Sequence, residues 1–261
     1  MSLVCLGSAH GAPGVTTTAL AVAATWPERR SCLLVEADPF GGVIAARYGL
    51  GDSPGLSSLA AVARRGLDDA VWQCTQQLPG GVRVLVGPGS ADEAHAVLGD
   101  LARAFAAWSA AQTEVDVIVD CGRMPPGSGV IGPLLGAGVV MVVTRPSLDQ
   151  LRPAAHRRAA LKESEIDAGL LLVGDRPYGP DEVAAAFGAE VAGVIAWDPR
   201  TAAVLSGTHG AVRDLRRSLL VRSAATLAAS LAPPRAVLDQ GVGMVPAAEV
   251  VASKVAEETG S

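Results

Sequence analysis

The sequence predicts a single α/β domain with a mostly parallel sheet of roughly seven strands and helices on both faces. Short apolar runs alternate with longer Ala- and Leu-rich stretches of helical period, which is typical of parallel strands joined by crossover helices. The chain has 261 residues, a length that suits one such domain. Its hydrophobic content of 49% excludes an intrinsically disordered chain.

Apolar runs are predicted to form the strands at 3–7, 32–36, 82–87, 115–120, 138–144, 168–173 and 190–195. Helices are predicted at 15–25, 57–77 (with Gly66 as a point where it can break), 91–111, 147–161, 180–187 and 211–231. Two consecutive prolines at 233–234 indicate that the domain, residues 1–232, ends there, and residues 233–261 are predicted to be a flexible tail.

Composition excludes several classes of protein. No uncharged apolar run reaches about 18 residues, so no membrane span is predicted. The first seven residues lack the basic start of a signal peptide, and we expect a cytoplasmic protein. The four cysteines lack CxxC spacing and are predicted to be reduced thiols rather than a zinc site or disulfides. The net charge of −5 argues against general nucleic-acid affinity but leaves a local basic face open.

The loop at 9–18 joins the first strand to the first helix and has the sequence AHGAPGVTTT. A glycine-containing turn that opens a helix directs backbone N–H groups and the positive helix end at an anion, so it is typical of a phosphate site. In the motif GxxxxGK[ST], Gly14 and Thr16 fit, whereas Ala9 replaces the first glycine and Val15 the lysine. Taken alone, the segment is also compatible with an ordinary strand-to-helix turn.

Carboxylates follow two further strands. Asp38 follows the second strand, and Asp120 ends the fourth in the Walker-B-like series Val-Asp-Cys-Gly. The carboxyl ends of parallel strands meet at one edge of the sheet, where such carboxylates hold Mg²⁺. We therefore predict a metal site of Thr16, Asp38 and Asp120, with Asp38 and Asp120 as the catalytic candidates of an active enzyme. The alternative is that both carboxylates only cap neighbouring turns.

In this order, these motifs resemble the MinD/ParA branch of deviant Walker-A (SIMIBI) P-loop proteins, whose loop is KGGxGKTT. The resemblance covers about residues 1–230, including the segment GVIAWDP at 193–199. It implies a P-loop NTPase-like domain that binds ATP or ADP with Mg²⁺. It also implies nucleotide contacts from the phosphate loop and from a base-binding pair after the sixth strand, namely Gly11, Gly14, Val15, Thr16 and Thr17, and Asp175 and Arg176.

A narrower resemblance is to the TadZ/CpaE-like proteins of Tad (Flp) pilus machinery, carried by the segments GAPGVTTTALA, EADPFGG and VGDRPYGP. It implies a homodimer that acts as a localisation or assembly factor for a pilus or secretion system through protein contacts. The receiver-like domain that usually precedes this one in TadZ/CpaE proteins is not present in the sequence.

The departures from the family pattern concern lysine. Only Lys162 and Lys254 are lysine among 21 Lys and Arg residues, so the first 161 residues contain none. His10 stands where the family has the lysine that reaches across a dimer, and Val15 where it has the lysine on the β- and γ-phosphates. Losing one preorganised donor at developing charge lowers a rate by about 10²–10³.

We therefore expect a pseudo-ATPase. The two alternatives for nucleotide are weak binding or none. Without the lysine that reaches across the interface, a dimer can form without nucleotide, and the sequence leaves open whether dimerisation requires it. Arg47 and Arg145 are candidates to reach a phosphate, although the sequence gives no evidence for either.

Two other functions are compatible with the superfamily. One is a nucleotide-switch ATPase that partitions DNA or another cargo, using basic residues of the last helix: Arg213, Arg216, Arg217 and Arg222. A solvated helix face is the simpler interpretation of this cluster. The other is a ligase-type enzyme similar to dethiobiotin synthetase, which the missing loop lysines oppose. The acidic tail is not a basic amphipathic membrane anchor.

Overall fold

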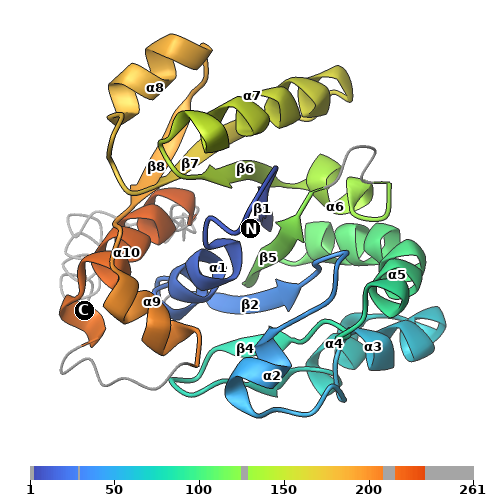
Figure 1. Ribbon diagram of the computed structural model, residues 1–261. Helices are drawn as coiled ribbons and strands as arrows, with labels where there is room; N and C mark the ends of the chain where they lie inside the picture. Colours follow the sequence, from blue (N-terminus) through green and yellow to red (C-terminus); the bar gives the residue numbers. More distant parts are fainter. Residues whose placement is uncertain (1–2, 29, 125–128, 208–214, 233–261) are drawn as a thin grey trace, which may run out of the picture.

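The computed structural model describes residues 3–28, 30–124, 129–207 and 215–232. They form one sheet with strand order β3-β4-β2-β5-β1-β6-β7-β8. Figure 1 labels all of these strands except the short edge strand β3. All neighbouring strands are parallel except the edge pair β3 and β4. The strands are β1 (Leu3–Ser8), β2 (Ser31–Glu36), β3 (Gln76–Gln77), β4 (Arg83–Leu85), β5 (Val115–Arg123), β6 (Val139–Thr144), β7 (Ala168–Val173) and β8 (Val191–Ile195).

Helices cover both faces of the sheet (Figure 1). One face packs against α3 (Leu56–Val62), η1 (Ala63–Arg65), α4 (Asp68–Gln73), α5 (Ala91–Ala111), α6 (Gly132–Ala137), α7 (Leu148–Glu163) and α8 (Pro180–Phe187). The other packs against α1 (Val15–Ala24), α2 (Ile44–Tyr48), α9 (Pro199–Leu205) and α10 (Leu219–Leu231), which follows the short 3₁₀ turn η2 (Leu215–Arg217). The predicted single α/β domain is confirmed.

The break at Gly66 that the sequence allows within the helix at 57–77 is confirmed, and the φ of Gly66, 110°, is left-handed. Other element predictions need correction. The described residues hold eight strands rather than roughly seven, because Gln76–Gln77, predicted as helix, pairs antiparallel with β4. The helix predicted at 211–231 begins only at Leu219, and its first residues, 211–214, lie outside the described part of the chain. The predicted tail at 233–261 also lies outside it.

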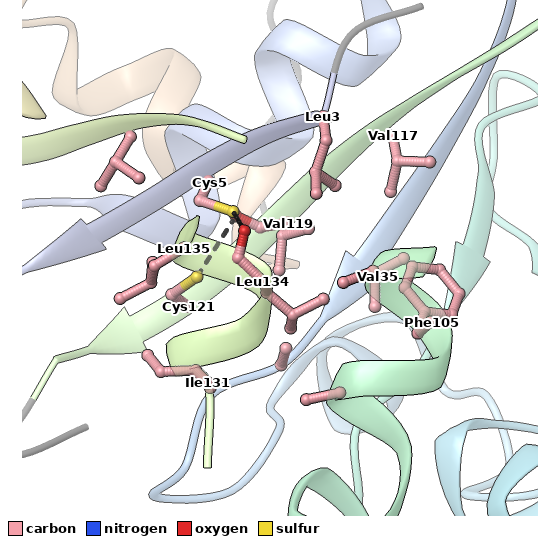
Figure 2. Close-up of a cluster of buried hydrophobic side chains, with 14 of the residues drawn as sticks. Leu3, Cys5, Val35, Phe105, Val117, Val119, Cys121, Ile131, Leu134 and Leu135 are labelled. Atoms are coloured by element: carbon pink, nitrogen blue, oxygen red, sulfur yellow. Dashed lines mark hydrogen bonds between the residues drawn. The ribbon is translucent and has the colours of Figure 1, made fainter. Parts of the chain in front are cut away.

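The core on the α5 side combines side chains from the strands and from the helices that cover this face. Figure 2 shows Val35, Cys5 and Val119 from the strands facing Phe105 of α5 and Leu134 of α6. Helix α5 begins where the Ser90 hydroxyl accepts a hydrogen bond from the amide of Glu93 (3.3 Å). Burying one such Leu, Val or Phe side chain stabilises the fold by about 1.5–3 kcal/mol.

An ion pair between the buried Asp116 and the partly exposed Arg30 fixes the beginning of β5. Asp116 is fully buried and accepts hydrogen bonds from the indole of Trp26 (3.0 Å) and from the guanidinium of Arg30. Arg30 also donates to the carbonyl of Thr113 (2.9 Å). These contacts tie the segment after α1 to the end of the sheet opposite the carboxyl ends of its parallel strands.

At the carboxyl edge, strand order brings distant segments together. Strand β5 lies between β1 and β2, and Asp120 of β5 is in register with Leu6 of β1 and Glu36 of β2. The loops that follow these three strands therefore meet at one edge, where open α/β sheets bind ligands. In the described part of the chain, no helix is long and apolar enough to span a membrane.

Candidate functional site

The loop after β1 lines a cavity of about 210 Å³ at the carboxyl edge of the sheet. Gly14 has a φ of 108° and precedes the first residue of α1, whose first-turn N–H groups have no partner within the helix. The remaining wall comes from the ends of β1 and β5, the segment after β2, and α2; the lining residues are Ser8, Gly11, Ala12, Pro13, Gly14, Val15, Thr16, Thr17, Asp38, Phe40, Arg47, Gly122 and Arg123.

The predicted loop residues and Asp38 thus line one cavity. The two positions where the family has lysine place no positively charged side chain in it. Val15, the first residue of α1, is only 6% exposed, and its side chain packs into the core on this face of the sheet. His10 is exposed and is not among the residues that line this cavity. The loop itself therefore contributes backbone N–H groups and hydroxyls to the cavity, and no cationic side chain.

Asp120 lies behind this wall and is fully buried. One carboxylate oxygen accepts a hydrogen bond from the amide of Gly122 (3.0 Å), and the other, Oδ2, has no partner among the described residues. Burial raises the pKa of Asp120 to about 7; the Thr16 hydroxyl lowers it, and the charges of Glu36 and Asp38 raise it. A buried oxygen without a partner is unfavourable, and a cation or an ordered water beside Thr16 would satisfy it.

Asp38 approaches the same point from β2. Its carboxylate accepts a hydrogen bond from the amide of Phe40 (2.8 Å). Burial raises the pKa of Asp38, while the amides of Phe40 and Arg123 and the charge of Arg123 lower it. A Cβ on Gly122, whose φ is 54°, would overlap the Asp38 carboxylate. Gly122 therefore allows Asp38 and Asp120 to lie close together.

The sequence interpretation did not identify the role of Glu36. Its buried carboxylate accepts hydrogen bonds from the amides of Val43 (2.6 Å), Ile44 (2.9 Å) and Gly87 (3.0 Å). Burial raises the pKa of Glu36, and these amides lower it. Glu36 thus fixes the beginning of α2 and, with it, the segment that carries Asp38. The signal that could have identified it is an acidic residue two positions before Asp38, at the end of the same strand.

A larger cavity of about 580 Å³ lies over the carboxyl ends of β6, β7 and β8. Asp175 and Arg176 line it, together with the exposed ring of Trp197. The guanidinium of Arg145 lies 4.4 Å from the centre of that ring. The ring of Trp197 offers an aromatic surface on which a planar base can stack. No sequence motif predicts this role for Trp197.

A third cavity, of about 290 Å³, adjoins both of the others. It shares Ala12, Gly14 and Thr17 with the phosphate-loop cavity, and Arg145 and Trp197 with the larger one. The two predicted groups of nucleotide contacts therefore line one continuous series of cavities along the edge of the sheet.

The basic residues predicted for DNA contact lie elsewhere. Arg216 and Arg217 are exposed in η2 and Arg222 is exposed on α10, whereas Arg213 lies outside the described residues. None of these three described arginines lines the cavities above.

No family model and no curated protein matches the chain. Solved structures do match, and they include MinD/ParA-family P-loop ATPases. The cell division ATPase MinD of Pyrococcus furiosus is 21% identical, with a TM-score of 0.67, over 88% of this chain and 98% of that one. A ParA family ATPase from Chlorobium tepidum is 20% identical, with a TM-score of 0.67, over 87% and 98%. MinD from Pyrococcus horikoshii, complexed with Mg-ADP, is 21% identical, with a TM-score of 0.66, over 88% and 96%. At these identities, the likeness establishes the MinD/ParA P-loop fold.

Proposed function

We propose that this chain is a MinD/ParA-like nucleotide-binding protein of low hydrolytic activity that acts in positioning or assembly through protein contacts. The observation that carries the proposal is the continuous series of cavities from the Gly11–Thr17 loop to Asp175 and Arg176. Its length and polar residues suit a nucleotide, with phosphates at the loop and the base beside Trp197. The similar MinD of Pyrococcus horikoshii holds Mg-ADP.

The residues present fit Mg²⁺. The unpartnered Oδ2 of Asp120 needs a positive or donating group, and Thr16 and Asp38 supply further oxygen atoms nearby. Oxygen ligands of this kind suit Mg²⁺, which would be held by Thr16 and, through water, by Asp120 and Asp38. When bound, Mg²⁺ neutralises phosphate charge.

The chain's own groups would bind and orient the nucleotide. The N–H groups at the start of α1 face the phosphates, and the half-buried Asp38 carboxylate can orient a water molecule at the cavity wall. Neither His10 nor Val15 supplies the positive charge that stabilises phosphoryl transfer in this fold. We expect hydrolysis to be lower by about 10²–10³ for each lost donor.

The biological role follows from the same features. A homodimer that does not depend on a lysine reaching across the interface can form without nucleotide, which suits a localisation factor. The loop sequence and the VGDRPYGP segment support a TadZ/CpaE-like role in a Tad-type pilus or secretion system.

Calorimetry with MgATP and MgADP, light scattering for mass and a phosphate-release assay test the proposal. We expect a nucleotide heat signal, a dimer with and without nucleotide, and negligible phosphate release. Tight binding with substantial turnover would show that the site is an active ATPase. No heat with either nucleotide would show that the cavities do not bind one.

A DNA-partitioning switch is the second candidate, favoured by the exposed positions of Arg216 and Arg222. Such binding would be nonspecific and would weaken as salt increases. Fluorescence anisotropy with duplex DNA at low salt compares the native chain with the Arg216→Ala/Arg222→Ala variant and with Arg103→Ala, an exposed residue of α5. Binding lost only in the double variant supports this candidate, and no binding at low salt eliminates it.

A further inference from the structure

Arg47 places a cation at the phosphate-loop cavity, and its buried Nη1 has no hydrogen-bond partner within the described ranges of the chain. It lies on α2 and lines the cavity together with Gly14, Thr16 and Asp38. A guanidinium normally forms several hydrogen bonds when it leaves water, so this group has unused donors beside a predicted anion site.

Helix α2 is fixed at both ends, which determines where Arg47 lies. At its beginning, the Glu36 carboxylate accepts hydrogen bonds from the amides of Val43 and Ile44. At its end, the Tyr48 hydroxyl donates to the carbonyl of Leu205 on α9 (2.8 Å). A side chain on Gly207 would overlap the carbonyl of Arg47, so the chain after α9 also packs closely against α2.

The other candidate cations near the phosphate loop are engaged elsewhere. Arg123 lines the cavity, but its guanidinium lies 5.0 Å from the centre of the Phe40 ring, and its charge acts on Asp38. Arg145 lies against Trp197 and lines the two neighbouring cavities, not this one. His10 does not line the cavity, and Val15 has no charge.

We infer that Arg47 is the phosphate-binding cation of this site and contacts the β- or γ-phosphate of the bound nucleotide in place of the loop lysine. The inference rests on the proposed nucleotide-binding function. A guanidinium suits this contact because its planar donors match two phosphate oxygens and it remains charged at all physiological pH values. The negative charge of Glu36 lies near Arg47. Because the Glu36 carboxylate forms its hydrogen bonds with backbone amides, the donors of Arg47 remain available to a ligand.

The test compares binding of AMP, MgADP, MgATP and pyrophosphate to the native chain and to the variants Arg47→Ala, Arg47→Lys and Arg103→Ala. Loss of a charge-assisted contact should weaken MgADP, MgATP and pyrophosphate binding by about tenfold to a hundredfold in Arg47→Ala. AMP affinity should stay unchanged, Arg47→Lys should recover part of the loss, and Arg103→Ala should match the native chain. Circular dichroism and thermal unfolding of each variant establish that it is folded.

The outcomes separate this inference from the proposed function. If the native chain binds MgADP and Arg47→Ala binds it equally well, Arg47 is not the cation, although the proposed function stands. The same holds if Arg145→Ala, rather than Arg47→Ala, removes the preference for di- and triphosphates. If the native chain binds no nucleotide, the proposed function fails, and pyrophosphate decides: binding lost in Arg47→Ala supports the inference, and no binding overturns it.

Discussion

Among single residues, Asp120 links the candidate site to the stability of the fold. Its carboxyl is fully buried and lies close to the charges of Glu36 and Asp38, and no residue in the described part of the chain forms a hydrogen bond with its Oδ2 atom. Its pKa is about 7 in the folded chain and close to 3.8 in an unfolded one. Between these values the folded state holds a proton that the unfolded state has released, so the free energy of unfolding falls as the pH rises from about 4 to 7.

Replacing Asp120 by Asn should remove this dependence. Asn keeps an oxygen for the Gly122 amide but carries no charge, so Asp120→Asn should gain about 2 kcal/mol in unfolding free energy, relative to the native chain, between pH 5 and pH 8. Urea unfolding without Mg²⁺ at the two pH values measures the difference. An equal difference at both would contradict the assigned environment. The same variant should lose the Mg²⁺ dependence of nucleotide binding.

Among the elements, the turn at the end of β5 brings the two carboxylates together. Gly122 has a φ of 54°, and its Cα faces the Asp38 carboxylate. A side chain there would require a strained backbone and would displace Asp38 from the cavity wall. The position therefore needs glycine for both its conformation and its surroundings.

Gly122→Ala should destabilise the chain by about 1–3 kcal/mol and weaken Mg²⁺-dependent nucleotide binding. Gly99→Ala is the matched control, since Gly99 lies exposed within α5 with no atom near an added Cβ. This control should stabilise the chain by about 0.5–1 kcal/mol. Denaturant titration compares both with the native chain. Equal effects of the two substitutions would show that the contact with Asp38 is unimportant.

Helices and strands with a recognisable local residue pattern could be predicted from the sequence, and the shortest elements could not. The parallel strands were predicted because each is a buried apolar run, and α5 and α8 because their periodicity and first residues agree. Helices α2, α6 and α9 were not predicted because, at five to seven residues, they are too short to show a helical period. Strand β3 was missed because its two residues are defined only by pairing with β4.

For the candidate site, the loop residues and Asp38 were predicted because each follows a strand whose end the topology places at one edge. Trp197 and the position of Arg47 could not be predicted in this way. The Arg47 side chain reaches the cavity because α2 docks against α9, a contact between Tyr48 and Leu205 that is 157 residues apart in the chain. No local pattern of residues encodes such a contact.

In the whole molecule, an ion pair that stabilises the fold and the cavities that are candidates for nucleotide binding lie at opposite edges of the sheet. The Asp116–Arg30 ion pair lies at the start of β5, and the cavities lie over the opposite edge. Removing the Asp116 carboxylate would leave the buried indole of Trp26 without its acceptor, whereas the partly exposed guanidinium of Arg30 can be solvated by water.

Asp116→Ala should therefore lower the free energy of unfolding by about 1–3 kcal/mol while nucleotide affinity at low temperature stays unchanged. Arg47→Ala should have the opposite effect, weakening affinity with little loss of stability. Denaturant unfolding and calorimetry on both variants test this separation. A parallel loss of stability and affinity in Asp116→Ala would show that the two ends of β5 are coupled.

The end of α9 connects the cavity to the molecular surface. Leu205, its last residue, accepts a hydrogen bond from Tyr48 of α2, and Ser206, which follows the helix, lies 3.5 Å from the hydroxyl of Thr17 of α1. If nucleotide shifts α1 relative to α2, the end of α9 must move with them. Coupling of this kind is reciprocal. If nucleotide binding changes the affinity of a partner protein for α9 by some factor, that partner changes the affinity of the chain for nucleotide by the same factor. A bound partner would then set how much of the chain holds nucleotide, without any hydrolysis.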